Sequence, residues 1–84
     1  MKKLLKFYGE YCMPCKQLTS IMSTMELPVP VEEINVEECE DELLKKYQIR
    51  SVPTLVLIDD DKFLWKHAGM ISAEQLSTEL KDYV

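Results

Sequence analysis

Apolar side chains recur along the chain with the spacing of three helices. From residue 14 onward they fall three and four residues apart, on one face of an amphipathic helix: Leu18, Ile21, Met22 and Met25. Pro28 and Pro30 cannot continue that helix. Acidic residues followed by Leu43, Leu44 and Tyr47 predict a second helix over 38–47. Ser72-Ala73-Glu74-Gln75 fits a capping box and predicts a third, with an inner face of Ala73, Leu76, Leu80 and Tyr83 or Val84.

Four short segments rich in β-branched, aliphatic and aromatic residues predict strands. They cover residues 4–8, 31–36, 54–58 and 62–67. The third is apolar almost throughout, which indicates burial on both faces. The three aspartates at 59–61 are interpreted as a turn, because consecutive acids lack the alternating ligand spacing of a calcium loop.

The resulting order is β-α-β-α-β-β-α. A strand, helix and strand in succession imply a right-handed parallel crossover, whereas the last two strands form an antiparallel hairpin. The sheet is therefore expected to be mixed and four-stranded, with helices on both faces that bury its apolar third strand. At this length residues 1–84 are expected to form a single α/β domain.

Composition and charge exclude several classes of function. Fifteen acidic residues against ten basic ones give a net charge of −5, which disfavours nucleic-acid binding. The longest aliphatic run, 55–58, is far short of the roughly 20 residues of a membrane helix. The basic start, 1–6, lacks the apolar stretch of a signal peptide. We therefore expect a cytoplasmic protein, a monomer, with no membrane or nucleic-acid partner.

Two of the three cysteines are spaced for chemistry. Cys12 and Cys15 lie where the first strand leads into the first helix, and a helix N-terminus stabilises a thiolate. Cys15 lies one turn further on, close enough to bond to Cys12, and Pro14 suits a first helical turn. The pair can therefore cycle between dithiol and disulfide. Structural zinc is disfavoured and no metal is expected, because strands separate the only other soft ligands, Cys39 and His67, from the pair.

Three segments in order resemble landmarks of the thioredoxin family. Residues 7–16, FYGEYCMPCK, resemble its active-site signature; residues 47–54, YQIRSVPT, its second landmark; and residues 68–76, AGMISAEQL, its third. The likeness covers nearly the whole chain and lacks only the N-terminal strand and helix of full-length thioredoxins. It implies a minimal thioredoxin-like fold and a thiol–disulfide oxidoreductase that reduces protein disulfides. It also implies no bound cofactor and a flavoprotein reductase of the thioredoxin type as electron donor.

The resemblance also implies roles for single residues. Cys12 matches the attacking cysteine, Cys15 the resolving cysteine, and Pro53 a cis-proline packed beside them. A cis bond before proline costs only about 0.5–1 kcal/mol. Val52 would offer backbone groups to an extended substrate, as in strand addition. An apolar ring for substrates would consist of Tyr11, Met13, Pro14, Val52 and Gly69.

Five positions depart from the family pattern. Tyr8 and Tyr11 stand where thioredoxins usually carry tryptophan, and Met13 replaces a glycine, which leaves the reduction potential open. Lys6 replaces a buried aspartate, and Glu33 stands where the family usually has the facing lysine. One interpretation is a surface ion pair worth about 0–1 kcal/mol. The other is a partly buried pair behind the resolving cysteine, in which Glu33 accepts that cysteine's proton and Lys6 favours its thiolate.

Two other functions compete with this one. A glutaredoxin-like, glutathione-dependent reductase has a similar length, but its motif usually places proline before an aromatic residue and it carries paired glycines near the last helix. Here the order is Met13-Pro14, and Gly69 has no glycine neighbour. A thioredoxin-fold binding subunit would not require intact cysteines. Both are therefore disfavoured.

Overall fold

The computed structural model describes residues 1–83 and has the predicted order of elements. The strands are β1 (Lys2–Tyr8), β2 (Val31–Asn35), β3 (Thr54–Asp59) and β4 (Lys62–Ala68). The helices are α1 (Met13–Ser23), α2 (Asp41–Lys46) and α3 (Ala73–Lys81). No helix among these residues is long and apolar enough to cross a membrane.

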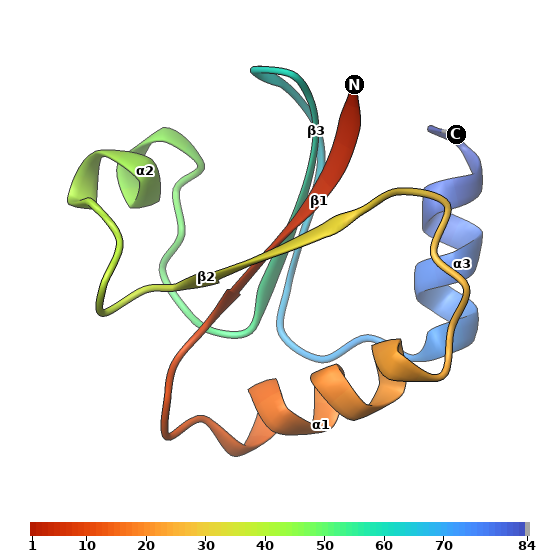
Figure 1. The fold of residues 1–84 in the computed structure, drawn as a ribbon, viewed down its shortest axis with the longest axis horizontal. Helices are drawn as coiled ribbons and strands as arrows, with labels where there is room; N and C mark the ends of the chain where they lie inside the picture. The colour runs from red at the N-terminus through yellow and green to blue at the C-terminus, as the bar shows by residue number, and fades with distance from the viewer. Residues whose placement is uncertain (84) are drawn as a thin grey trace.

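The strands form a mixed sheet in the order β2-β1-β3-β4 (Figure 1). β1 pairs in parallel with β2 and antiparallel with β3, and β3 and β4 form the predicted antiparallel hairpin. The register places Lys6 opposite Glu33 on one side and opposite Leu55 on the other. β1 is therefore a central strand, and residue 6 lies inside the sheet.

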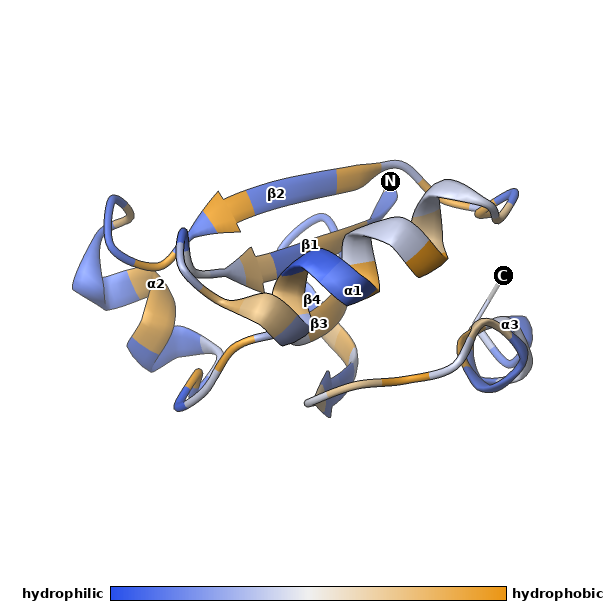
Figure 2. Ribbon diagram, turned by 90° about the horizontal axis from the view of Figure 1, so that it is seen from below, coloured by the Kyte–Doolittle hydropathy of each residue, from blue (hydrophilic) through white to orange (hydrophobic). Residues whose placement is uncertain are grey.

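Each face of the sheet has its own core, because successive residues of β1 and β3 point to opposite faces. Leu4 and Leu57 pack with α1 and α3, while Leu5 and Val56 pack with α2 (Figure 1). Both strands are apolar on both faces, whereas the edge strand β2 has a hydrophilic centre (Figure 2). The prediction of helices on both faces is confirmed.

The second helix begins three residues later than the sequence pattern predicts. Asn35 ends β2, and its side-chain oxygen accepts a hydrogen bond from the Glu37 N–H (2.9 Å). Its carbonyl accepts from the N–H groups of Glu38 and Cys39. These bonds hold the first acidic residues in a turn, so α2 contains only Asp41–Lys46. The predicted start at residue 38 was wrong because asparagine competes with the helix for backbone donors.

The third helix begins as predicted. The Ser72 hydroxyl caps α3 by accepting a hydrogen bond from the Gln75 N–H (3.1 Å). Leu76 and Leu80 are buried on the inner face, and Tyr83 packs against the same core. Val84, the alternative inner residue, lies outside the described part of the chain.

Candidate active site

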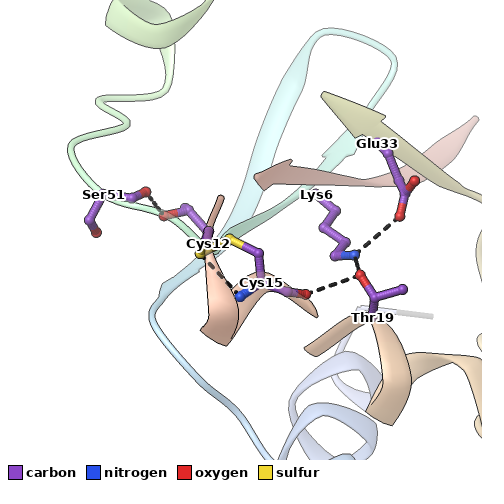
Figure 3. The surroundings of a disulfide bond; sticks show 7 residues. Lys6, Cys12, Cys15, Thr19, Glu33 and Ser51 are labelled. Carbon is purple, nitrogen blue, oxygen red and sulfur yellow. Dashed lines mark hydrogen bonds and ion pairs between the residues drawn. A yellow bond between two sulfur atoms is a disulfide. The ribbon is translucent and has the colours of Figure 1, made fainter. Parts of the chain in front are cut away.

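The two cysteines close a disulfide at the N-terminus of α1 (Figure 3). Cys12 is the N-cap, and its sulfur accepts a hydrogen bond from the Cys15 N–H (3.1 Å). Pro14 stands in the first helical turn, and the cysteine Cα atoms are 5.2 Å apart, within the usual range for a disulfide. Cys15 is only 3% exposed, while Cys12 is half-buried. Cys12 is thus the more accessible sulfur, at the helix end that favours negative charge.

The segment before β3 packs beside Cys12. A Cβ atom built on Gly9 would lie 3.6 Å from Val52 Cγ2 and 3.7 Å from Cys12 Cβ, so both residues border Gly9. The Val52–Pro53 peptide bond is cis, as the resemblance implies. The Pro53 carbonyl accepts a hydrogen bond from the Gly69 N–H (2.8 Å). The fold therefore brings together three segments that lie far apart in the sequence.

Large apolar side chains are exposed around this site. Tyr11 is 87% exposed and Met13 63%, as expected for residues that flank Cys12. Met70, which is 41% exposed, follows directly after Gly69. Met70 was not predicted as part of this surface, although its position next to a landmark glycine was a usable signal. Exposed apolar side chains gathered around a reactive pair are typical of a surface that binds another protein.

Lys6 lies on the other side of the disulfide from Ser51 (Figure 3). Its side chain is 3% exposed, and its ammonium group donates hydrogen bonds to Thr19 Oγ1 and to Glu33 Oε1, the latter over 3.1 Å. The Thr19 hydroxyl in turn donates to the Cys15 carbonyl (3.0 Å). A polar chain therefore runs from the buried ammonium to the backbone of Cys15.

The two interpretations of this pair each hold in part. The ion pair forms, and Lys6 is buried rather than on the surface. The Glu33 side chain, however, is 54% exposed, so its carboxylate remains in water. The expected desolvation of Glu33 is wrong, because β2 is an edge strand of the sheet and the Glu33 side chain stays more than half exposed there. Thr19 was not predicted, since nothing in the sequence pairs residue 19 with residue 6.

A hollow of about 250 Å³ lies behind the disulfide. It is lined by the two residues of the ion pair, Thr19, Cys15 and residues that flank them: Lys6, Tyr8, Gly9, Glu10, Cys15, Lys16, Thr19 and Glu33. Glu10, Lys16 and Glu33 are exposed, so the hollow connects the buried Cys15 with solvent. Water can therefore reach the inner side of the disulfide.

The remaining candidate residues lie apart from this arrangement. Cys39 is a free, half-buried thiol whose nearest acceptor is the Val36 carbonyl (3.8 Å). His67 Nε2 is 3.0 Å from the Met70 carbonyl oxygen, and its ring stacks on Trp65. Within residues 1–83 no group of three or more His, Cys, Asp or Glu side chains is arranged to hold a metal ion.

Comparisons with known proteins agree with this geometry. The family model for thioredoxin matches residues 1–82. A thioredoxin from Chlamydia pneumoniae is 34% identical over 77 residues, which cover 88% of this chain and 74% of the relative. A thioredoxin from Rickettsia bellii is 40% identical over 58 residues, covering 64% of this chain and 54% of the relative. The solved structure of a mutant thioredoxin from Halobacterium salinarum superposes with a TM-score of 0.86 at 30% identity, covering 98% of this chain and 74% of that one.

Proposed function

Because this chain belongs to the thioredoxin family and is a thiol–disulfide oxidoreductase, we propose that Cys12 is its attacking cysteine and Cys15 its resolving cysteine. The contrast in exposure carries this assignment. A sulfur buried to 3% exposure cannot meet a substrate protein, whereas the half-buried Cys12 can. The N-terminal position in α1 supports the thiolate that the attack requires.

The reaction proceeds in two exchanges. The Cys12 thiolate attacks one sulfur of a substrate disulfide, and the other substrate sulfur leaves as a thiolate that takes a proton from water. The Cys15 thiolate then attacks the Cys12 sulfur, and the bond between Cys12 and the substrate breaks. Two electrons have passed to the substrate, which is now a dithiol, and the protein carries the disulfide.

The substrate surface is proposed to be the apolar ring around Cys12 with Met70 added, and it is called the substrate rim below. Tyr11 and Met13 lie on one side of Cys12, and Val52 offers its backbone to an extended segment on the other. Gly69 and the exposed Met70 continue the rim next to Pro53. Disulfide-bearing proteins in general are the partners that this surface suits.

We further propose a setting for this cycle. A chain that carries a free thiol, Cys39, in addition to a reactive dithiol is suited to a reducing compartment, which supports a cytoplasmic location. A flavoprotein reductase would reduce the Cys12–Cys15 disulfide again, so that the protein carries electrons from that enzyme to its substrates. The family match over residues 1–82 and the single sheet support one domain that works as a monomer.

Reduction of insulin by dithiothreitol tests the assignment. The wild-type protein should accelerate it, and Cys12→Ser should abolish that acceleration. Without dithiothreitol, Cys15→Ser should instead accumulate covalent complexes with substrate proteins. These complexes should be visible on a non-reducing gel and should disappear when excess thiol is added before electrophoresis. Cys39→Ser is the matched control and should behave as wild type. Acceleration no greater than the uncatalysed background would refute the proposal, and activity only with glutathione would favour a glutaredoxin-like reductase.

A further inference from the structure

Lys6 places a positive charge directly behind the resolving cysteine. It lies in the central strand β1, and its side chain is 3% exposed. Its ammonium reaches Cys15 through a single hydroxyl, that of Thr19, which accepts from Lys6 and donates to the Cys15 carbonyl. Both hydrogen bonds run in the same direction, so the chain starts at the ammonium and ends with the Thr19 hydroxyl donating to the backbone carbonyl of Cys15.

The other charged and titratable groups around the hollow are less able to act on Cys15. Glu10, Lys16 and Glu33 are exposed, so water and salt screen their charges. Tyr8 is half-buried. Lys6 is the one buried charge that lines this hollow among the described residues. Because the Lys6 side chain is itself withdrawn from water, its charge is the least screened of these, and it should act most strongly on Cys15.

We propose that Lys6 is a positioning residue that stabilises the thiolate of Cys15 and thereby accelerates the resolving step. This inference rests on the proposed function of the cysteine pair. As the Cys15 thiol ionises, its proton passes to water in the hollow. The thiolate then attacks the Cys12 sulfur, and the substrate sulfur leaves with the electron pair of the broken bond. Glu33 pairs with Lys6 from the solvent side, where water screens its charge, and takes no part in the proton transfer.

The size of the effect follows from two opposing terms. A nearby opposite charge moves the titration of a group by about 1 to 3 pH units. Below the titration midpoint, each unit changes the thiolate fraction tenfold. A thiolate also becomes less nucleophilic as it becomes less basic, with a Brønsted coefficient of about 0.4–0.5. On a logarithmic scale this loss offsets roughly half of the gain in thiolate fraction. Loss of the Lys6 charge should therefore slow the resolving step about three- to thirtyfold at neutral pH.

Ellman's reagent separates the two exchanges in one experiment. All proteins compared carry Cys39→Ser, which removes the third thiol that would also react. Cys12 of the reduced protein then attacks the reagent and releases a first thionitrobenzoate, and Cys15 displaces the second. Stopped-flow absorbance would give both rates across a pH series. Lys6→Met removes the charge while keeping an apolar chain of similar length. We expect it to move the midpoint of the second phase to higher pH and slow that phase at neutral pH, with the first phase nearly unchanged.

Two further variants give the controls. Lys3 lies on the same strand and pairs with Glu32 over 2.6 Å, but it is partly exposed, so Lys3→Met should alter neither phase. Glu33→Gln changes an exposed side chain and should fold even if Lys6→Met does not. It removes the charge that opposes Lys6, so the second phase should be as fast as in wild type or faster.

The outcomes distinguish this inference from the function on which it rests. A wild-type second-phase rate and midpoint in Lys6→Met would overturn the role of Lys6. A slower second phase in Glu33→Gln would also overturn it, since the carboxylate would then be the proton acceptor. A Cys39→Ser protein with Lys6 intact that releases only one thionitrobenzoate would instead refute the proposed role of Cys15.

Discussion

The two glycines of this chain should respond to alanine substitution with opposite signs. Gly9 has an ordinary backbone conformation, and an added Cβ atom would lie 3.6 Å from Val52 and 3.7 Å from Cys12, at normal contact distance. Alanine there would reduce the conformational freedom of the unfolded chain and fit the folded one. Such a change stabilises by about 0.4–1 kcal/mol, and a partly buried methyl group adds less than about 0.8 kcal/mol.

Gly69 is the matched control because its site has space but the wrong backbone. Within residues 1–83, no atom outside its two chain neighbours lies within 4 Å of an added Cβ atom, yet φ is +92°. A side chain in that region costs about 1–3 kcal/mol, which exceeds the gain from the unfolded state. Gly69→Ala should therefore destabilise by about 0.5–2 kcal/mol although it clashes with nothing.

Urea unfolding of the oxidised protein measures both changes. The urea midpoint should rise for Gly9→Ala and fall for Gly69→Ala at unchanged slope. In thermal unfolding, each change of 1 kcal/mol in the free energy of unfolding should move the melting temperature by about 4–8 °C. A lower midpoint for Gly9→Ala would show that the space beside Cys12 and Val52 is not there. A neutral Gly69→Ala would show that the backbone at residue 69 relaxes without cost.

Two further predictions concern the cap of α3 and the substrate rim. Ser72→Ala should lower the free energy of unfolding by about 0.5–2 kcal/mol, because the Gln75 N–H loses its acceptor. Ser77→Ala, on the exposed face of α3, should be neutral or stabilising, and equal effects of the two changes in urea unfolding would contradict the cap. Met13→Ser and Met70→Ser should each lower kcat/KM for insulin about fivefold, equivalent to about 1 kcal/mol of lost apolar burial, and should leave the reaction with Ellman's reagent unchanged. An unchanged kcat/KM for insulin would show that the substituted residue does not belong to the substrate rim.

Local patterns were sufficient wherever neighbours in sequence decide the structure. The apolar runs of β1 and β3 and the Ser72 cap depend on nearby residues and were predicted correctly. The start of α2 was not, because a single side chain, Asn35, redirected the backbone donors that follow it. Here a local competition between a turn and a helix was decided by hydrogen bonds that periodicity does not reveal.

The site divides in the same way. The spacing of Cys12 and Cys15 is local, so the sequence was enough to predict the disulfide. The contact of Lys6 with Thr19 depends on how α1 crosses the sheet, and the exposure of Glu33 depends on β2 being an edge strand. Both are properties of the assembled sheet, and no local sequence pattern indicates them.

The central position of β1 also matters while the chain is being synthesised. β1 leaves the ribosome before the other three strands of the sheet, and its partner β3 follows only after α1, β2 and α2. At about 5–20 residues per second, the edge of β1 that will meet β3 stays unpaired for a time on the order of seconds.

An unpaired apolar strand is an aggregation hazard, and a charge within it is a known safeguard. Lys6 interrupts the sequence Leu4-Leu5-Lys6-Phe7, whose three apolar members are all buried in the finished fold. We therefore expect the lysine that lies behind the disulfide in the folded protein to have an earlier effect as well, because its charge disfavours pairing of the nascent strand with other chains.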